Sequence, residues 1–374
     1  MLKEFRHKDI EEVFKTSIVQ QTAYWSEVKK ELGVRSIACN FKVRSSDIYD
    51  VPKKDYTIIG DILVIIKQID NKYTMAYVPY GPEIEPLAQN QGTFLEELSE
   101  CLRPYLPKNC ILIRYDLSWE SLWAKEDDFY DCKGYWIGPP DNKFQEFRFN
   151  HNTISWNFKK CLSNILPSNT IFLDLKKDLA DIKMSMKPKT RYNIELSARK
   201  EVTVNIAGIE NLDTWYRLYT ETAARNGFYL HNIDYFRAVL TSRANNTQSP
   251  AEVFLLIAGI DKMPLSAMFL VLTGNRGTYL YGASASHHKN LMASYAVQWE
   301  AIKLAKAKGC TEYDMFGVSP NPDPSHPLFG LYRFKTGFGG ELYHTMGCWD
   351  YPIMSDMYEY FTAVELKSQG FHLN

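Results

Sequence analysis

The chain has 374 residues, of which 45% are hydrophobic and 14% aromatic, so it can bury a large core and is long enough for two domains. Its 43 Lys and Arg residues nearly balance 44 Asp and Glu residues, and the formal net charge of −1 argues against binding nucleic acid or membranes through overall charge. A polyanionic partner would have to meet a local basic patch.

The seven cysteines are odd in number and scattered, without the spacing of a metal site or a disulfide framework. We expect reduced thiols and no metal. The N-terminal sequence MLKEFRHKDIEEVF lacks the apolar core of a signal peptide, and no apolar run approaches the roughly 18 residues of a membrane-spanning helix. These features predict a cytoplasmic protein, which can still contact a membrane-borne substrate.

The first half of the chain predicts a helix, antiparallel strands, a second helix and a further strand. Apolar residues at helical spacing predict a helix over residues 11–32. Asp70-Asn71 separates two strand-like segments, which is a hairpin signal. Thr93, with Glu96 three residues later, predicts the start of the second helix. The expected strands are 36–43, 61–69, 72–80 and 110–115.

Residues 117–168 carry no clear pattern, and after them the same order of elements returns. The expected strands are 170–175, 202–206, 252–260, 265–273, 278–284 and 312–316, and the expected helices are 212–225, 233–240 and 294–308. Both halves therefore contain antiparallel strands, a helix and another strand. We infer a duplicated α+β unit with a mixed β-sheet in each half.

The element order of the second half resembles N-acyltransferases of the GNAT type. In those enzymes, the segment between the central strand and the next helix usually cradles the CoA pyrophosphate with glycines. Here that segment, residues 284–294, reads SASHHKNLMAS and contains no glycine. Because backbone N–H groups approach a phosphate closely only where side chains are small, this loop is poorly built for CoA. An acyl group should arrive on a larger carrier.

The basic segment 183–200 is a candidate for contact with tRNA as that carrier. It holds six cations against one acid, Glu195, and Tyr192 offers a ring for stacking on a base. The alternative is a solvated helix face, which charge runs usually are. The cations that we expect to meet tRNA phosphates are Lys183, Lys187, Lys189 and Arg191.

The segment 330–340, GLYRFKTGFGG, places Lys335 beside Phe334 and ahead of three glycines. Its neighbours partly desolvate the lysine, and the glycines allow a tight turn behind it. This arrangement suits a cation held still for a reacting carbonyl or phosphate. The alternative is the glycine-capped end of a helix with a solvated lysine.

Five segments along the chain, taken in order, resemble the FemABX peptidyltransferases, which are aminoacyl-tRNA-dependent enzymes that build peptidoglycan cross-bridges. These segments are 25–29 (WSEVK), 113–116 (IRYD), 224–236, 294–300 (SYAVQWE) and 330–353. The chain lacks a long heptad insertion and so is similar to the shorter members without a coiled-coil arm.

The resemblance implies two tandem GNAT-like domains with mixed β-sheets, and a C-terminal segment that returns to the first domain. Residues 1–168 with 350–374 would bind the peptidoglycan precursor, and residues 169–349 would form the aminoacyl-tRNA side. Lys29, which follows Trp25, matches the lysine that helps hold the phosphates of the UDP-muramyl peptide.

The resemblance also implies roles near the reacting groups. Asp116 matches an active-site aspartate that orients or deprotonates the incoming amine, and Lys335, with Phe334, matches the lysine near the aminoacyl ester. Tyr235 and Tyr281 match tyrosines that line the precursor cleft.

Three positions qualify this picture. His231 stands where shorter members carry an arginine against the diphosphate, and histidine is a weaker, pH-dependent cation. Either Arg225 or another basic group compensates, or the phosphate is presented differently. The family's tyrosine on the strand before the aspartate is Ile111 here, and because Tyr279 shares a strand with Tyr281, we expect one of these two tyrosines in the core.

The resemblance implies transfer of Gly, Ala or Ser from aminoacyl-tRNA to the side-chain amine of the diamino acid in UDP-MurNAc-pentapeptide or lipid II. A lipid-linked acceptor would bring peripheral membrane contact. An aminoacyl ester is already activated, so neither a cofactor nor a covalent enzyme intermediate is needed. We assign Asp116 to the amine and Lys335 to the oxyanion or the tRNA terminus.

Three other functions remain open: aminoacyl-tRNA-dependent transfer to another amine, CoA-dependent N-acylation, and RNA binding without chemistry. A serine nucleophile is weakly supported, because Ser284, Ser286 and His287 have no nearby acid to orient the histidine. His287-His288 lacks the further ligands of a metal site.

Overall fold

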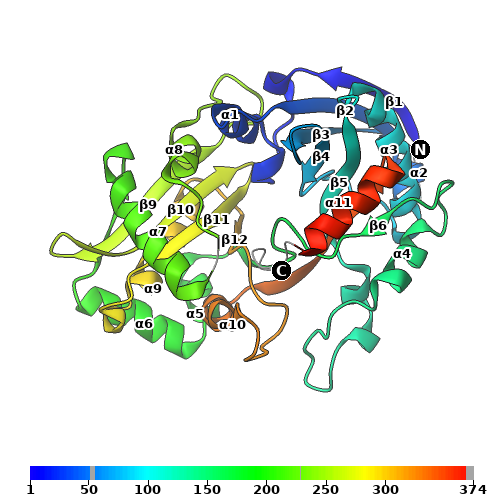
Figure 1. The fold of residues 1–374 in the computed structure, drawn as a ribbon. Helices are drawn as coiled ribbons and strands as arrows, with labels where there is room; N and C mark the ends of the chain where they lie inside the picture. Colours follow the sequence, from blue (N-terminus) through cyan, green and yellow to red (C-terminus); the bar gives the residue numbers. More distant parts are fainter. Residues whose placement is uncertain (51–54, 228, 368–374) are drawn as a thin grey trace.

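The computed structural model describes residues 1–50, 55–227 and 229–367. The strands join in the order β1-β2-β3-β4-β5-β13-β7-β12-β11-β10-β9-β8, with β6 pairing beside β13 (Figure 1). The expected α+β fold with mixed sheets is confirmed. Phe228 of the segment 224–236, and residues 368–374 of the expected first domain, lie outside the described residues. No helix in the described ranges is long and apolar enough to cross a membrane.

The same strand pattern occurs twice. The strands of the first half are β1 (Leu2–Lys8), β2 (Ser36–Arg44), β3 (Thr57–Gln68), β4 (Thr74–Pro79), β5 (Cys110–Glu120) and β6 (Lys159–Lys160). Those of the second half are β7 (Asn169–Asp174), β8 (Thr203–Ala207), β9 (Glu252–Ile260), β10 (Met263–Thr273), β11 (Arg276–Ser284) and β12 (Glu312–Asp314). Three antiparallel strands lead to a fourth that is parallel to the third, as β2 to β5 and again as β9 to β12. This is the duplication that the sequence predicts.

Helices cover both faces of the sheet. They are α1 (Ala23–Glu31), α2 (Ser45–Ile48), α3 (Gln91–Leu102), α4 (Asn142–Asn150), α5 (Leu179–Ser185), α6 (Pro188–Arg199), α7 (Leu212–Asn226), α8 (Ile233–Thr241), α9 (Ala293–Ala307), α10 (Phe329–Lys335) and α11 (Ser355–Lys367). In the second half, α7 and α8 pack on one face of the sheet, and α6 and α9 pack on the other (Figure 1). In the first half, α3 covers one face, while α1 and α11 lie over the opposite face.

Strand β13 (Glu341–Pro352) joins the two halves. Its residues 341–344 pair with β7, and its residues 345–352 pair with β5. Gly339 and Gly340, with φ of +83° and +86°, occupy a region that side chains disfavour and turn the chain from α10 into β13. The C-terminal segment therefore returns to the first half, as predicted, although the change of partner precedes the expected boundary after residue 349.

Two predictions of local structure are wrong. The helix expected over residues 11–32 is confined to α1, because Thr22 accepts the N–H of Trp25 and caps the helix there, while short 3-10 turns precede it. Thr93 lies inside α3 rather than at its start. Glu96 does not complete a capping box, because its carboxylate accepts backbone N–H groups from residues 154 and 155, each at 2.7 Å. Strand β1 was not anticipated.

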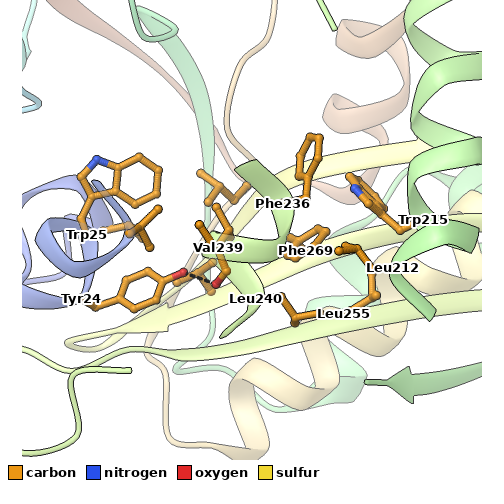
Figure 2. Packing of buried hydrophobic residues seen from close by; sticks show 14 of the residues in the cluster. Tyr24, Trp25, Leu212, Trp215, Phe236, Val239, Leu240, Leu255 and Phe269 are labelled. Atoms are coloured by element: carbon orange, nitrogen blue, oxygen red, sulfur yellow. Dashed lines mark hydrogen bonds between the residues drawn. The ribbon is translucent and has the colours of Figure 1, made fainter. Parts of the chain in front are cut away.

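Helix α1 belongs to the first half by sequence but packs into the second. Tyr24 donates its hydroxyl proton to the carbonyl of Val239 in α8 at 2.6 Å (Figure 2). Behind this contact, the ring of Trp215 lies edge-on to Phe236 and Phe269, with centroids 5.4 and 4.8 Å away. Both halves thus share one core cluster, which fixes α1 against α8.

Candidate active site

A cavity of about 760 Å³ opens at the junction between the two halves. Lys67 of β3, residues of the 164–169 linker, His231, β11 and Lys335 of α10 form its wall. The described lining residues include two lysines and neither an aspartate nor a glutamate. Such a wall attracts anions, and its size suits a small organic ligand or part of a larger one. We call it the junction cavity.

Lys335 is held inside this wall as a buried cation, with 4% of its surface exposed. Its ammonium donates to the carbonyls of Phe316 at 3.0 Å and Gly317 at 2.6 Å, which leaves one of its three protons for a ligand. Burial lowers the pKa of Lys335 to about 7, although Asp314 opposes the shift. The group can therefore hold or release a proton near neutral pH.

Phe334 packs among other aromatic rings. Its ring packs edge-on to Tyr295 and Phe338, with centroids 5.0 and 5.2 Å away, and it is not among the residues that line the junction cavity. This packing holds α10 in place and so positions Lys335. Phe334 therefore supports the lysine and does not itself border the cavity.

Two of the predicted precursor residues, His231 and Tyr281, line the junction cavity, and three others lie against them. The ring of His231 stacks on Tyr235, with centroids 4.4 Å apart and an interplanar angle of 17°. The hydroxyls of Tyr235 and Tyr281 hydrogen-bond at 2.6 Å. The ammonium of Lys29 lies over Trp25 and Tyr235, 4.7 and 5.3 Å from the ring centroids. The structure thus brings together five residues from three segments that lie far apart in sequence.

Two groups in this cluster carry lowered pKa values. Burial, aided by repulsion from Lys67, lowers the pKa of Lys29 to about 8. Burial, aided by Lys29, also lowers the pKa of His231, so the imidazole is neutral at pH 7. Lys29 and Lys67 therefore provide the positive charge in this cluster. This agrees with the expectation that another basic group compensates for His231.

Asp116 lies one layer behind the cavity wall and is fully buried. Its Oδ2 accepts the hydroxyl of Tyr77 at 2.9 Å and the N–H of Leu166 at 2.8 Å. Burial raises the pKa of Asp116. Of the two predicted roles, orienting neighbouring groups fits this geometry, because a ligand in the cavity does not touch the carboxylate.

Arg225 is engaged elsewhere. At the end of α7, it donates to the carbonyl and hydroxyl of Ser284 and to the hydroxyl of Ser286, at 3.0 to 3.1 Å. Glu221 accepts the N–H of Ser286. These bonds hold the glycine-free loop after β11, and Arg225 is not among the residues that line the junction cavity.

The expectation that either Tyr279 or Tyr281 lies in the core is wrong. Both are half-buried and both line the junction cavity. The register between β10 and β11 shifts at residues 269/270, opposite the step from Tyr281 to Tyr279. The ring of Tyr279 also lies 5.1 Å from the ammonium of Lys335.

The four predicted tRNA contacts differ in availability. Lys183 pairs with Glu195 at 3.1 Å, and Arg191 donates to backbone carbonyls between α5 and α6. Lys187 and Lys189 are exposed. The backbone N–H of Lys187 donates to the carbonyl of Gly337 at 2.9 Å, so this end of the basic segment touches the turn that follows Lys335.

Ile111 is 2% exposed and packs beneath α11 with Met75, so this corner of the first half is core rather than ligand surface. Sequence reasoning missed Lys67 and Tyr77. A single lysine within a strand of apolar residues is only a weak sign that the strand borders a cavity. The residues that surround Lys67 are known only from the fold.

The model of the FemAB family matches residues 7–261 and 244–366. The chain belongs to the FemAB family. The lipid II:glycine glycyltransferase of Staphylococcus saprophyticus is 24% identical over 271 residues, covering 56% of this chain and 65% of that protein. The protein of the same name from Staphylococcus aureus is 23% identical over 274 residues, with the same coverage. The match thus spans slightly less than two thirds of these relatives.

The fold of this FemAB member is shared with a solved structure. The crystal structure of FemX superposes with a TM-score of 0.69 at 17% identity, covering 96% of this chain and 100% of that chain. The likeness extends through both halves, which agrees with the tandem GNAT-like arrangement seen in the strand order.

Proposed function

We propose that this FemAB protein transfers an amino acid from aminoacyl-tRNA to the side-chain amine of the diamino acid in a peptidoglycan precursor. The observation that carries the proposal is Lys335, a buried cation on the wall of an anion-attracting cavity between the two halves, with one N–H that no described residue accepts. The names of the curated relatives favour glycine as the transferred residue and lipid II as the acceptor.

In the proposed reaction, the amine of the acceptor attacks the ester carbonyl of the aminoacyl-tRNA. A C–N bond forms, the C–O bond to the ribose breaks, and the proton lost by the amine ends on the leaving ribose oxygen. The free N–H of Lys335 stabilises the oxyanion that develops on the carbonyl. With a pKa of about 7, Lys335 can also deliver a proton to the leaving oxygen.

The two halves would receive different substrates. Residues 1–168 and the C-terminal segment would bind the precursor, whose phosphates would meet Lys29, while Trp25, Tyr235 and Tyr281 would line its path. Residues 169–349 would face the tRNA, with Lys187 and Lys189 beside the turn after α10. Asp116 would orient Tyr77 and the linker rather than contact the amine.

The test is a transfer assay with a mixture of tRNAs charged with labelled amino acids, offered with either lipid II or UDP-MurNAc-pentapeptide. We expect label on the acceptor, and ribonuclease treatment of the donor should abolish it. A parallel reaction with labelled acetyl-CoA tests the GNAT-type alternative. Transfer from acetyl-CoA, or no transfer from any charged tRNA to either acceptor, would contradict the proposal.

A further inference from the structure

We propose that Lys67 and Lys29 together form a binding site for the diphosphate of the acceptor, with Lys67 supplying the cation that faces the cavity. The inference rests on the proposed function, since both candidate acceptors carry a diphosphate. It adds a residue that neither the sequence motifs nor the matched relatives point to.

Lys67 stands near the end of β3, opposite Met75 of β4, and its side chain reaches the junction cavity. Its ammonium lies 5.0 Å from the centre of the Tyr77 ring. Across the described residues, no carboxylate comes within 4.0 Å of this ammonium. Burial, aided by Arg114, lowers the pKa of Lys67, which shows a cation poorly compensated by its surroundings.

The acids behind Lys67 are engaged with other partners. Asp350 and Glu365 both bind Arg114, with nitrogen to oxygen distances of 2.7 Å. Asp116 accepts from Tyr77 and from the linker backbone. Of these carboxylates, Asp116 and Glu365 raise the pKa of Lys67, and they do so only from a distance. The charge of Lys67 is therefore available to a ligand on the cavity side.

Lys29 is near enough that Lys67 depresses its pKa. Lys29 does not line the junction cavity itself, but it lies over the ring of Tyr235, whose hydroxyl bonds that of Tyr281 in the cavity wall. Two neighbouring ammonium groups repel one another in the free protein, and a bound dianion relieves that repulsion. The two phosphates of a diphosphate offer several acceptor oxygens, so both lysines can donate to one ligand.

Two other basic groups near the site are less suited to this role. Arg225 is bound to Ser284 and Ser286, and the lowered pKa of His231 leaves it neutral at pH 7.

A second cavity, of about 490 Å³, lies beyond Phe316 and Pro167, which line both cavities. It is unsuited to an anion, because the described residues that line it include one arginine and six acids: Glu83, Glu85, Glu120, Glu312, Asp314 and Glu341. The diphosphate therefore belongs in the junction cavity.

The experiment measures the binding of three ligands to the full chain by titration calorimetry: UDP-MurNAc-pentapeptide, MurNAc-pentapeptide without the nucleotide and diphosphate, and inorganic pyrophosphate. The variants are K67M, K67R and K72M. Lys72 is a matched control, because it is an exposed lysine in the turn after the same strand. Circular dichroism confirms that each variant is folded.

We expect K67M to weaken binding of the UDP-linked ligand and of pyrophosphate by about tenfold to a hundredfold, the range for a hydrogen bond to a charged group. Binding of MurNAc-pentapeptide should not change. K67R should retain most of the affinity, and K72M should match the wild type. Lys67 is not the diphosphate ligand if K67M weakens the ligands with and without diphosphate equally, or weakens none of them.

The pyrophosphate arm separates this inference from the proposed function. If the wild type binds pyrophosphate and K67M does not, while neither muramyl ligand binds, the anion site stands and the proposed acceptor is wrong. If the wild type and K67M are indistinguishable toward both diphosphate ligands, the assignment of Lys67 is overturned whatever the acceptor.

Discussion

Burial tunes the two lysines on which the proposed chemistry depends. Lys335 is enclosed by carbonyls that cannot neutralise it, and its pKa falls to about 7. Lys29 is sandwiched between aromatic rings, and its pKa falls to about 8. Lys29 was singled out through resemblance to a family, and Lys335 through its local sequence as well. The extent of their burial could not be predicted, because it depends on groups distant in sequence: Tyr235 for Lys29, and the carbonyls of Phe316 and Gly317 for Lys335.

The lowered pKa of Lys29 predicts a pH dependence of acceptor binding. A diphosphate prefers the protonated lysine, which is present below a pH of about 8 in the free protein, so affinity is retained there and falls as the pH rises above 8. Titration calorimetry between pH 6.5 and 9.5 measures this affinity for the acceptor. The variant K29M should bind more weakly and lose the inflection near pH 8. An unchanged wild-type affinity across this range would contradict the assignment.

The buried position of Asp116 predicts a mild phenotype for D116N. An amide oxygen can still accept from Tyr77 and Leu166, so we expect kcat to fall by less than about tenfold, whereas loss of a direct general base costs roughly a hundredfold or more. Steady-state kinetics with separate kcat and KM values distinguishes an orienting role of Asp116 from the role of a direct general base. A fall as large as that of a Lys335 variant would show that Asp116 acts on the amine directly.

Among the elements, those defined by local pattern were predicted best. Strand β9 has the predicted bounds, and α7 and α9 differ from prediction by about one residue, because alternation, turn dipeptides and helical spacing are local signals. The start of α1 was missed, because Thr22 outweighs the apolar spacing before it. The bulge between Tyr279 and Tyr281 of β11 could not be predicted, because it depends on pairing with β10.

Strand β13 is held by a buried ion pair that its sequence does not reveal. Asp350 makes two hydrogen bonds to Arg114 of β5, at 2.7 and 2.8 Å, and each side chain is 1% exposed. Glu365 of α11 adds two further bonds to the same guanidinium. The pair fastens the part of β13 that crosses into the first half.

We predict that Asp350→Ala lowers the free energy of unfolding by about 3 kcal/mol, because the buried guanidinium would keep only Glu365 as an acidic partner. Denaturant unfolding measures the change. The control is Glu312→Gln, which breaks a more exposed pair with Arg276 and should cost less than about 1 kcal/mol. Equal effects of the two variants would show that burial does not strengthen the Asp350 pair.

For the whole molecule, the duplicated unit was readable from element order, but the joining of the two units was not. β13 completes both sheets, α1 packs into the opposite half, and the junction cavity takes residues from both. Long-range pairing of this kind leaves no periodic trace in a single sequence. The separation of charge between two adjacent cavities likewise exists only in the folded chain: among the described lining residues, one cavity has no acid and the other has six.

The central claim is that Lys335, at the junction of the halves, promotes transfer of an aminoacyl group from tRNA to the amine of a peptidoglycan precursor. Its most direct test is the single-turnover rate of glycine transfer from labelled glycyl-tRNA to lipid II by the wild type and by Lys335→Ala, with both substrates saturating. We predict ribonuclease-sensitive transfer by the wild type and a rate about a hundredfold lower for the variant. Near-normal transfer by the variant, or none by the wild type, would contradict the account.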